Sequence, residues 1–137
     1  MSTPIWKPNE SQILNANVTK FISFVNQERG LKLSNYWDLH QFSIDHSDNF
    51  WRLCADYCGA VGDFSGPERV GESMVDTQWF PEAKLNFAET MLSRRDEKDA
   101  IVFRGENKIE LRLSFSDLYL KVAKVQSHMR SCGVGPG

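Results

Sequence analysis

Residues 100–115 carry the pattern that most constrains this fold, because apolar and polar side chains alternate along them. The apolar positions of the second half are Ile109, Leu111, Leu113 and Phe115. A period of two predicts a strand with one buried face, and "GENK" supplies the turn of a hairpin. A two-stranded hairpin is marginally stable by itself. We therefore expect the hairpin to pack against a helix or to form one edge of a larger sheet.

A helix is predicted directly after the hairpin, over residues 116–132, with Ser116 as its cap and Gly133 as its end. Its apolar side chains keep helical spacing, at Leu118, Val122, Val125 and Met129. The sequence then ends in "GVGPG", where a further strand would be expected to begin. We expect this chain to be a piece of a longer protein.

The first helix is predicted over residues 9–29. Asn9 and Gln12 resemble a capping box, and Gly30 is a suitable stop. One stripe of this helix is apolar and comprises Leu14, Val18, Phe21, Ile22 and Val25.

Two shorter helices follow, over 34–45 and 47–59, with Ser34 and Ser47 as expected caps. The apolar face of the second is expected to contain Phe50, Cys54, Tyr57 and Cys58, with Trp51 beside them. Three helices joined by short turns indicate a compact helical segment.

The glycine-rich stretch 59–80 is predicted to be an irregular connection. A helix from about Ala83 to Leu92 and a charged link over 93–99 complete the chain. The expected fold class is therefore α+β, with a helical segment followed by a hairpin and a helix.

Composition narrows the class of protein. The chain has 137 residues, a length that usually means one domain, and its 41% hydrophobic and 25% charged residues argue against disorder. A net charge of −2 disfavours a broad phosphate-binding face. Three cysteines do not make a disulfide framework, and no stretch resembles a signal peptide or a membrane span of about 18 apolar residues. The simplest compartment is the cytoplasm.

No recognisable catalytic set is present, since the sequence lacks a P-loop, a serine elbow and a metal-binding helix with two histidines. The glycines of 133–137 follow a helix instead of opening one, which favours a turn over a phosphate cradle. We assign no catalytic, cofactor-binding or metal-ligating residue.

Cys54 and Cys58 stand four residues apart on a predicted helix, with His40 and His46 nearby in sequence. Four such ligands could hold zinc. The apolar surroundings of Cys54 favour buried thiol packing instead.

His128 on the last helix is expected to be a surface residue. Four arginines would meet phosphate only if folding gathered them, and ordinary surface charge is the simpler interpretation: Arg69, Arg94, Arg95 and Arg104.

Three stretches resemble the short-chain acyl-CoA synthetases, which are AMP-forming, adenylate-forming ligases. These are "YWDLHQFSIDHSDNFW", "WFPEAKLNFAETML" and "LSFSDLYLKVAKVQSHMRSCGVGPG", and they occur in the family's order. Trp79, Phe80, Leu85 and Asn86 are similar to acetyl-CoA synthetases, whereas Pro81, Ala83, Ala88 and Glu89 look more like acetoacetyl-CoA synthetases. Glu82 stands where the family usually has glycine, and Thr90 where it often has asparagine.

The resemblance implies an N-terminal fragment of a ligase that activates acetoacetate with ATP and Mg²⁺ and transfers it to CoA. Residues 1–92 would be the helical N-terminal segment, and 93–137 the start of the AMP-binding domain, which begins the large α/β domain. The family's catalytic motifs lie downstream of residue 137, so the fragment alone should be inactive and bind no cofactor. Its partner would be the rest of its own polypeptide, without nucleic acid or a membrane span.

Two alternatives stay open. The fragment could belong to an acetyl- or propionyl-CoA synthetase, or it could be a helical interaction module without enzymatic function. Whether the reading frame continues beyond residue 137 distinguishes the ligase from the module.

Trp79 and Phe80 are adjacent large rings just before the predicted helix of 83–92. Burying each ring is worth roughly 1.5–3 kcal/mol. Our hypothesis is that they are packing anchors that pin the helical N-terminal segment against the main body of the ligase, with direct contact to CoA or substrate as the alternative.

Overall fold

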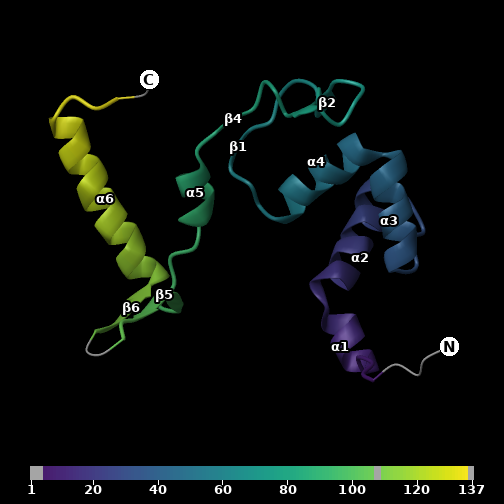
Figure 1. Ribbon diagram of the computed structural model, residues 1–137, viewed down its shortest axis with the longest axis horizontal. Coiled ribbons are helices and arrows are strands. Elements are labelled where there is room, and N and C mark those ends of the chain that lie inside the picture. The colour runs from purple at the N-terminus through teal and green to yellow at the C-terminus, as the bar shows by residue number, and fades with distance from the viewer. Residues whose placement is uncertain (1–4, 107–108, 136–137) are drawn as a thin grey trace. The chain divides into compact units, whose positions relative to one another are not determined.

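The computed structural model describes residues 5–106 and 109–135. Contacts divide the chain into two compact units, Met1–Leu85 and Asn86–Gly137 (Figure 1). The fold class is α+β, as predicted, and the strands form short antiparallel pairs, of which only the hairpin was expected. The assignment of 1–92 and 93–137 to segments of a ligase stays a prediction.

The first unit opens with two helices where one was predicted: α1 (Glu10–Asn15) and α2 (Asn17–Arg29). Ala16 between them has extended dihedrals, which ends the first helix. The predicted capping box is present, since Asn9 Oδ1 accepts from the Gln12 N–H and Gln12 Oε1 accepts from the Asn9 N–H, both at 2.9 Å. Local sequence thus set the start of the helical unit.

Helix α3 (Tyr36–Asp45) is capped by Asn35. The prediction that Ser34 caps this helix is therefore wrong. The Asn35 side-chain oxygen accepts from the Trp37 N–H at 2.8 Å. Ser34 instead donates from its hydroxyl and its N–H to the Asp38 carboxylate, at 2.6 and 2.7 Å, and these bonds lower the pKa of Asp38. Both residues therefore form hydrogen bonds at the start of the helix, and Asn35 is the one that caps it.

Helix α4 (Ser47–Tyr57) begins one residue after its N-cap His46, which makes no side-chain capping bond. The prediction that Ser47 caps this helix is therefore wrong. The Ser47 hydroxyl accepts from Arg69 Nη1 at 3.1 Å, so it connects α4 to a later segment.

Helices α2, α3 and α4 enclose a small core (Figure 1). Its buried side chains are Phe21, Val25, Leu39 and Leu53. Partly buried residues pack around them, namely Ile22, Phe24, Leu31, Leu33, Phe42, Phe50 and Cys54. Of the predicted stripe of the first helix, Leu14 and Val18 are exposed. Leu53, absent from the predicted apolar face of α4, is the most buried residue of that helix, whereas Cys58 is exposed.

Four strands of two residues each occur between α4 and α5. Within the first unit, β1 (Gly62–Asp63) pairs antiparallel with β4 (Lys84–Leu85), and β2 (Arg69–Val70) with β3 (Gln78–Trp79). The connection predicted to be irregular is thus closed by two short ladders. Leu85 and Lys84 are extended, so the helix predicted from Ala83 begins later.

The second unit begins with α5 (Phe87–Met91), which Asn86 caps by accepting from the Ala88 N–H at 3.0 Å. The predicted hairpin is present as β5 (Asp99–Arg104) and β6 (Glu110–Ser114), and the antiparallel pairing is confirmed. Part of the predicted turn, 107–108, lies outside the described residues.

Helix α6 (Phe115–Ser131) follows β6 without a linker. Its cap is Ser114, which accepts from the Asp117 N–H at 3.1 Å, so the prediction of Ser116 is wrong by two residues. The Ser116 N–H donates to the Asp96 carbonyl at 3.1 Å instead. Gly133 follows the end of the helix, as predicted.

The face of β6 that was predicted to be buried is mostly open, since Ile109 and Leu111 are exposed and Leu113 is half-buried. A hairpin covered by one helix does not fill this face. Among the described helices, none is long and apolar enough to cross a membrane.

Candidate functional site

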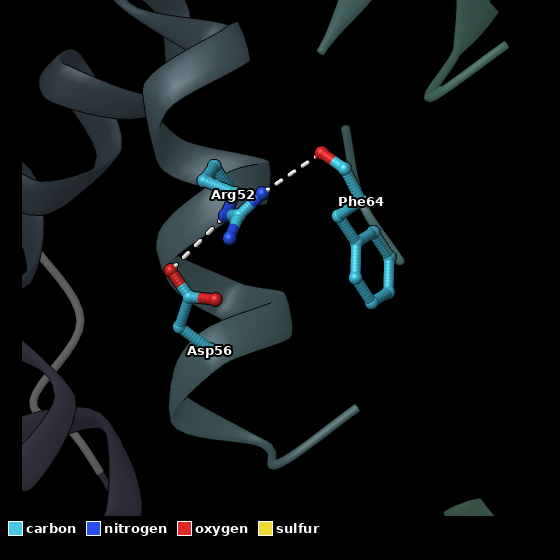
Figure 2. A network of polar contacts seen from close by, with 3 residues as sticks. All are labelled: Arg52, Asp56 and Phe64. Carbon is cyan, nitrogen blue, oxygen red and sulfur yellow. Dashed lines mark hydrogen bonds and ion pairs between the residues drawn. The ribbon is translucent and has the colours of Figure 1, made fainter. Parts of the chain in front are cut away.

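Arg52 on α4 holds the long connection 59–80 in place (Figure 2). Its Nε lies 3.2 Å from Oδ2 of Asp56, one turn along the helix, and its Nη1 donates to the Phe64 carbonyl oxygen at 3.1 Å. The guanidinium carbon is 5.7 Å from the centroid of the Phe64 ring. The ion pair with Asp56 orients the guanidinium, so that one side chain contacts both the backbone and the ring of the connection.

Two aromatic contacts fasten the same connection further along. Trp79 meets Trp51 edge-on, with ring centroids 6.1 Å apart, and Phe80 meets Phe64 edge-on at 5.4 Å. Both rings therefore pack inside the first unit, where they join β3 to α4 and to the start of the connection. That they pin this segment against the main body of a longer protein stays a prediction. Whether either ring touches a ligand in a longer protein stays a prediction.

Phe80 adopts a backbone conformation that bulky residues rarely take, with a φ of 47°. Its N–H donates to the Glu68 carbonyl at 2.9 Å, directly beside the β2–β3 ladder. A conformation of this kind costs of order 1–3 kcal/mol and persists only where the surroundings fix it. The contact with Phe64 and the bond to Glu68 supply that constraint.

The histidines weighed as zinc ligands lie against rings. His40 is 6.1 Å from both Tyr36 and Trp37, and His46 is 5.4 Å from Phe42, measured between ring centroids. In the described part of the chain, no group of three or more His, Cys, Asp or Glu side chains could hold a metal ion. Although these histidines are near Cys54 in the sequence, the fold does not bring them together with it as a metal site.

All three cysteines are free. Burial raises the pKa of the Cys54 thiol, and the neighbouring Cys58 raises it further. Cys54 is half-buried against the core, which agrees with thiol packing. Cys132 and His128 face each other at the end of α6, with 3.8 Å between Sγ and Nε2, and both are exposed.

The four arginines weighed as phosphate ligands each have a contact within their own unit. These are Arg69 with the Ser47 hydroxyl, Arg94 with Asp96 and the Phe115 ring, Arg95 with the Tyr119 ring, and Arg104 with Glu110. The bond from Arg94 lowers the pKa of Asp96. Surface pairing and stacking account for these side chains, as the simpler interpretation had predicted.

The second unit has a cavity of about 470 Å³ between α5 and α6. Its polar wall comprises Asn86, Glu89, Arg95, Tyr119, Gln126 and Arg130. The guanidinium carbon of Arg95 lies over the Tyr119 ring, 4.0 Å from its centroid. Among the described residues that line this cavity there is no serine, cysteine or histidine.

Comparison with known proteins gives a consistent result, although no protein-family model matches the sequence. An acetoacetyl-coenzyme A synthetase of Rhizobium meliloti (strain 1021) is 32% identical over 136 residues, which are 98% of this chain and 21% of the relative. A solved acetoacetyl-CoA synthetase from Streptomyces lividans superposes with a TM-score of 0.81 at 28% identity, covering 99% of this chain and 22% of that one. This chain is similar over nearly its whole length to a segment of the acetoacetyl-CoA synthetases.

The resemblance to that group of acyl-CoA synthetases is thereby confirmed, and these relatives are ligases. The chain spans about a fifth of the length of the acetoacetyl-CoA synthetases that it matches. A malonamoyl-CoA synthetase of Penicillium aethiopicum is 34% identical over 125 residues, or 85% of this chain and 17% of the relative. Relatives named for different acids thus share this segment.

Sequence reasoning missed Arg52, whose guanidinium contacts both the backbone carbonyl and the ring of Phe64. Its partner Phe64 is twelve residues away and takes part through a backbone carbonyl, which no side-chain pattern reveals. The spacing of Arg52 and Asp56 by four was a visible signal, because such pairs share one helix face.

Replacing Arg52 with methionine should lower the free energy of unfolding by about 1–2 kcal/mol, because it removes a charge-assisted bond to a backbone carbonyl. It should also speed proteolytic cleavage within 59–80, since the connection loses its attachment to α4. Urea unfolding and limited proteolysis measure the two effects.

The matched control is Arg104→Met, which removes an ion pair whose two side chains are 83% and 72% exposed. This change should cost less than about 0.5 kcal/mol. Equal losses for the two variants would show that the Arg52 bond to Phe64 contributes nothing beyond an ordinary surface pair.

Proposed function

We propose that this chain is the N-terminal portion of an AMP-forming acetoacetate–CoA ligase. The supporting observation is a match over 98% of the chain to an acetoacetyl-coenzyme A synthetase, of which it covers 21%. The fold supports the same assignment, with a TM-score of 0.81 to a solved member.

In the proposed reaction, acetoacetate attacks the α-phosphate of ATP, giving acetoacetyl-AMP and pyrophosphate. The CoA thiol then displaces AMP and forms acetoacetyl-CoA. Magnesium accompanies the ATP, and the reaction takes place in the cytoplasm. The sequence has no phosphate-cradling loop with lysine, and in this proposal the reactive groups belong to the remaining polypeptide.

The role of residues 1–137 is therefore structural. The Arg52 bond to Phe64 and the Trp51–Trp79 contact hold a long connection against a helical unit. In this proposal they keep the start of the ligase in one shape while the chemistry occurs elsewhere.

The test is to extend the reading frame beyond residue 137 and express the longer product. It should release pyrophosphate when acetoacetate and ATP are both present, and form acetoacetyl-CoA once CoA is added. The 137-residue chain alone should do neither. A frame that stops at residue 137, or ligase activity in the isolated chain, would contradict the proposal.

The identity of the acid needs its own comparison, because the Penicillium relative is a malonamoyl-CoA synthetase. Acetoacetate, malonamate, acetate and propionate should be offered at equal concentration, and the values of kcat/KM compared. We expect acetoacetate to be preferred. A preference for another acid would retain the ligase class and correct the substrate.

A further inference from the structure

Helix α6 has an apolar stripe that its own unit covers only in part, since Val122 alone of the stripe also lines the cavity beside α5. Its 17 residues include none that is buried. Val122, Val125 and Met129 recur at intervals of three and four, which places them on one side of the helix. All three are exposed, and they line a shallow hollow of about 320 Å³ together with Lys121 and Gln126.

The neighbouring elements do not account for the stripe. Helix α6 contacts β5 and β6, yet Val125 and Met129 are still 55% and 51% exposed. A long helix with an open apolar stripe usually has that stripe against another element. The face of β6 that carries Leu111 is also exposed, so the second unit has apolar side chains open on two of its surfaces.

We propose that the stripe of Val122, Val125 and Met129 is a docking surface for the polypeptide that follows residue 137 in the longer ligase. This inference rests on the proposed function. The missing length is ample, since the matched synthetases are nearly five times as long as this chain. The segment also has the same fold in the Streptomyces synthetase, where it is 22% of a continuous chain.

The same helix offers a matched comparison site. Leu120 is 54% exposed and Val125 is 55% exposed, but at 3.6 residues per turn Leu120 falls on the side opposite the stripe. Both are apolar, and both lie well inside α6. If the stripe alone is covered in the longer protein, only position 125 should behave as a buried site.

A photoreactive benzophenone amino acid placed at position 125 of the longer protein reports its neighbour directly. Irradiation should yield an adduct within one polypeptide, to a peptide beyond residue 137, as read by mass spectrometry. The same group at position 120 should give little or none of this adduct. An adduct between two copies, an adduct only to residues 1–137, or equal yields at the two positions would each overturn the proposal.

Thermal unfolding of the longer protein provides a second measurement. Val125→Asp places a charge where apolar contact is expected and should lower the melting temperature by about 5 °C or more. Leu120→Asp should lower it by about 1 °C or less. Equal shifts would contradict the docking surface, and the crosslinking result stands even where Val125→Asp prevents folding.

Neither readout depends on activity. A longer protein that crosslinks as expected but forms no acyl-CoA would retain the docking surface and refute the ligase. Normal ligase activity without the crosslink would do the reverse.

Discussion

Replacing Leu53 with alanine should cost the helical unit about 2–5 kcal/mol. Leu53 is 2% exposed and is one of the four buried apolar side chains found among the described residues. Truncation removes buried apolar surface and leaves a cavity that the surrounding helices can only partly fill. A loss of this size is a large share of the roughly 5–15 kcal/mol that a typical domain has, so unfolding should begin at much lower urea. Far-UV circular dichroism follows it, because α1 to α4 all belong to this unit.

Leu14→Ala is the control for this prediction. Leu14 lies in α1 and is 68% exposed, so the same chemical change should alter the free energy of unfolding by no more than about 0.5 kcal/mol. Sequence spacing had placed Leu14 on the apolar stripe of the first helix and had left Leu53 off the predicted apolar face of α4, the reverse of their burial. If Leu14→Ala lowered the free energy of unfolding as much as Leu53→Ala, the assignment of Leu53 to the core and of Leu14 to the surface would be contradicted.

Features decided within a few residues were predicted well. The Asn9–Gln12 capping box and the stop at Gly30 both formed, because each depends on neighbours within one turn. The hairpin was found because strict alternation has no helical interpretation. The resemblance to acyl-CoA synthetases also came from local stretches of sequence.

Predictions failed where neighbouring polar residues could each serve as the cap of a helix. Three serines were assigned as caps, and none of them caps its helix. Asn35 displaced Ser34, while Ser47 instead accepts a bond from Arg69, 22 residues away. Partners at that separation are set by the folded chain, and spacing along a helix carries no information about them.

The sequence predicted the contacts of the candidate site only in part. Trp79 and Phe80 were expected to pin the helical segment against a main body, whereas the contacts found are with Trp51 and Phe64 of their own unit, and these partners could not be named from the sequence. The reason is geometric, since the connection bends back onto α4 through two strand pairs of two residues each. Ladders of that length leave no periodic signal in the sequence.

Replacing Gly71 with alanine should open the loop between β2 and β3. The φ of Gly71 is +106°, and a Cβ there would lie 2.4 Å from the Asp76 carbonyl oxygen and 3.0 Å from Cα of Thr77. Backbone atoms cannot move aside as a flexible side chain can. The loop is also held from within, because the Ser73 hydroxyl lies 2.6 Å from Asp76 Oδ2 and the Thr77 hydroxyl donates to the Ser73 carbonyl at 2.6 Å.

The expected cost is about 1–3 kcal/mol of backbone strain, with displacement of Asp76 in addition. Because the loop can open without unfolding the core, the effect should be greatest in local hydrogen exchange. The Phe80 amide, which bonds Glu68 beside the ladder, should exchange about tenfold to hundredfold faster.

Gly30→Ala separates the two contributions to this effect. Gly30 has a φ of +64°, but a Cβ there would have nothing within 4 Å, so alanine should cost only the left-handed conformation, about 1–2 kcal/mol. It should loosen the end of α2 and leave exchange at Phe80 unchanged. If Gly71→Ala were no more damaging than Gly30→Ala, the approach of Asp76 to Gly71 would carry no energetic weight. The loop between β2 and β3 would then be held by its Ser73 and Thr77 bonds alone.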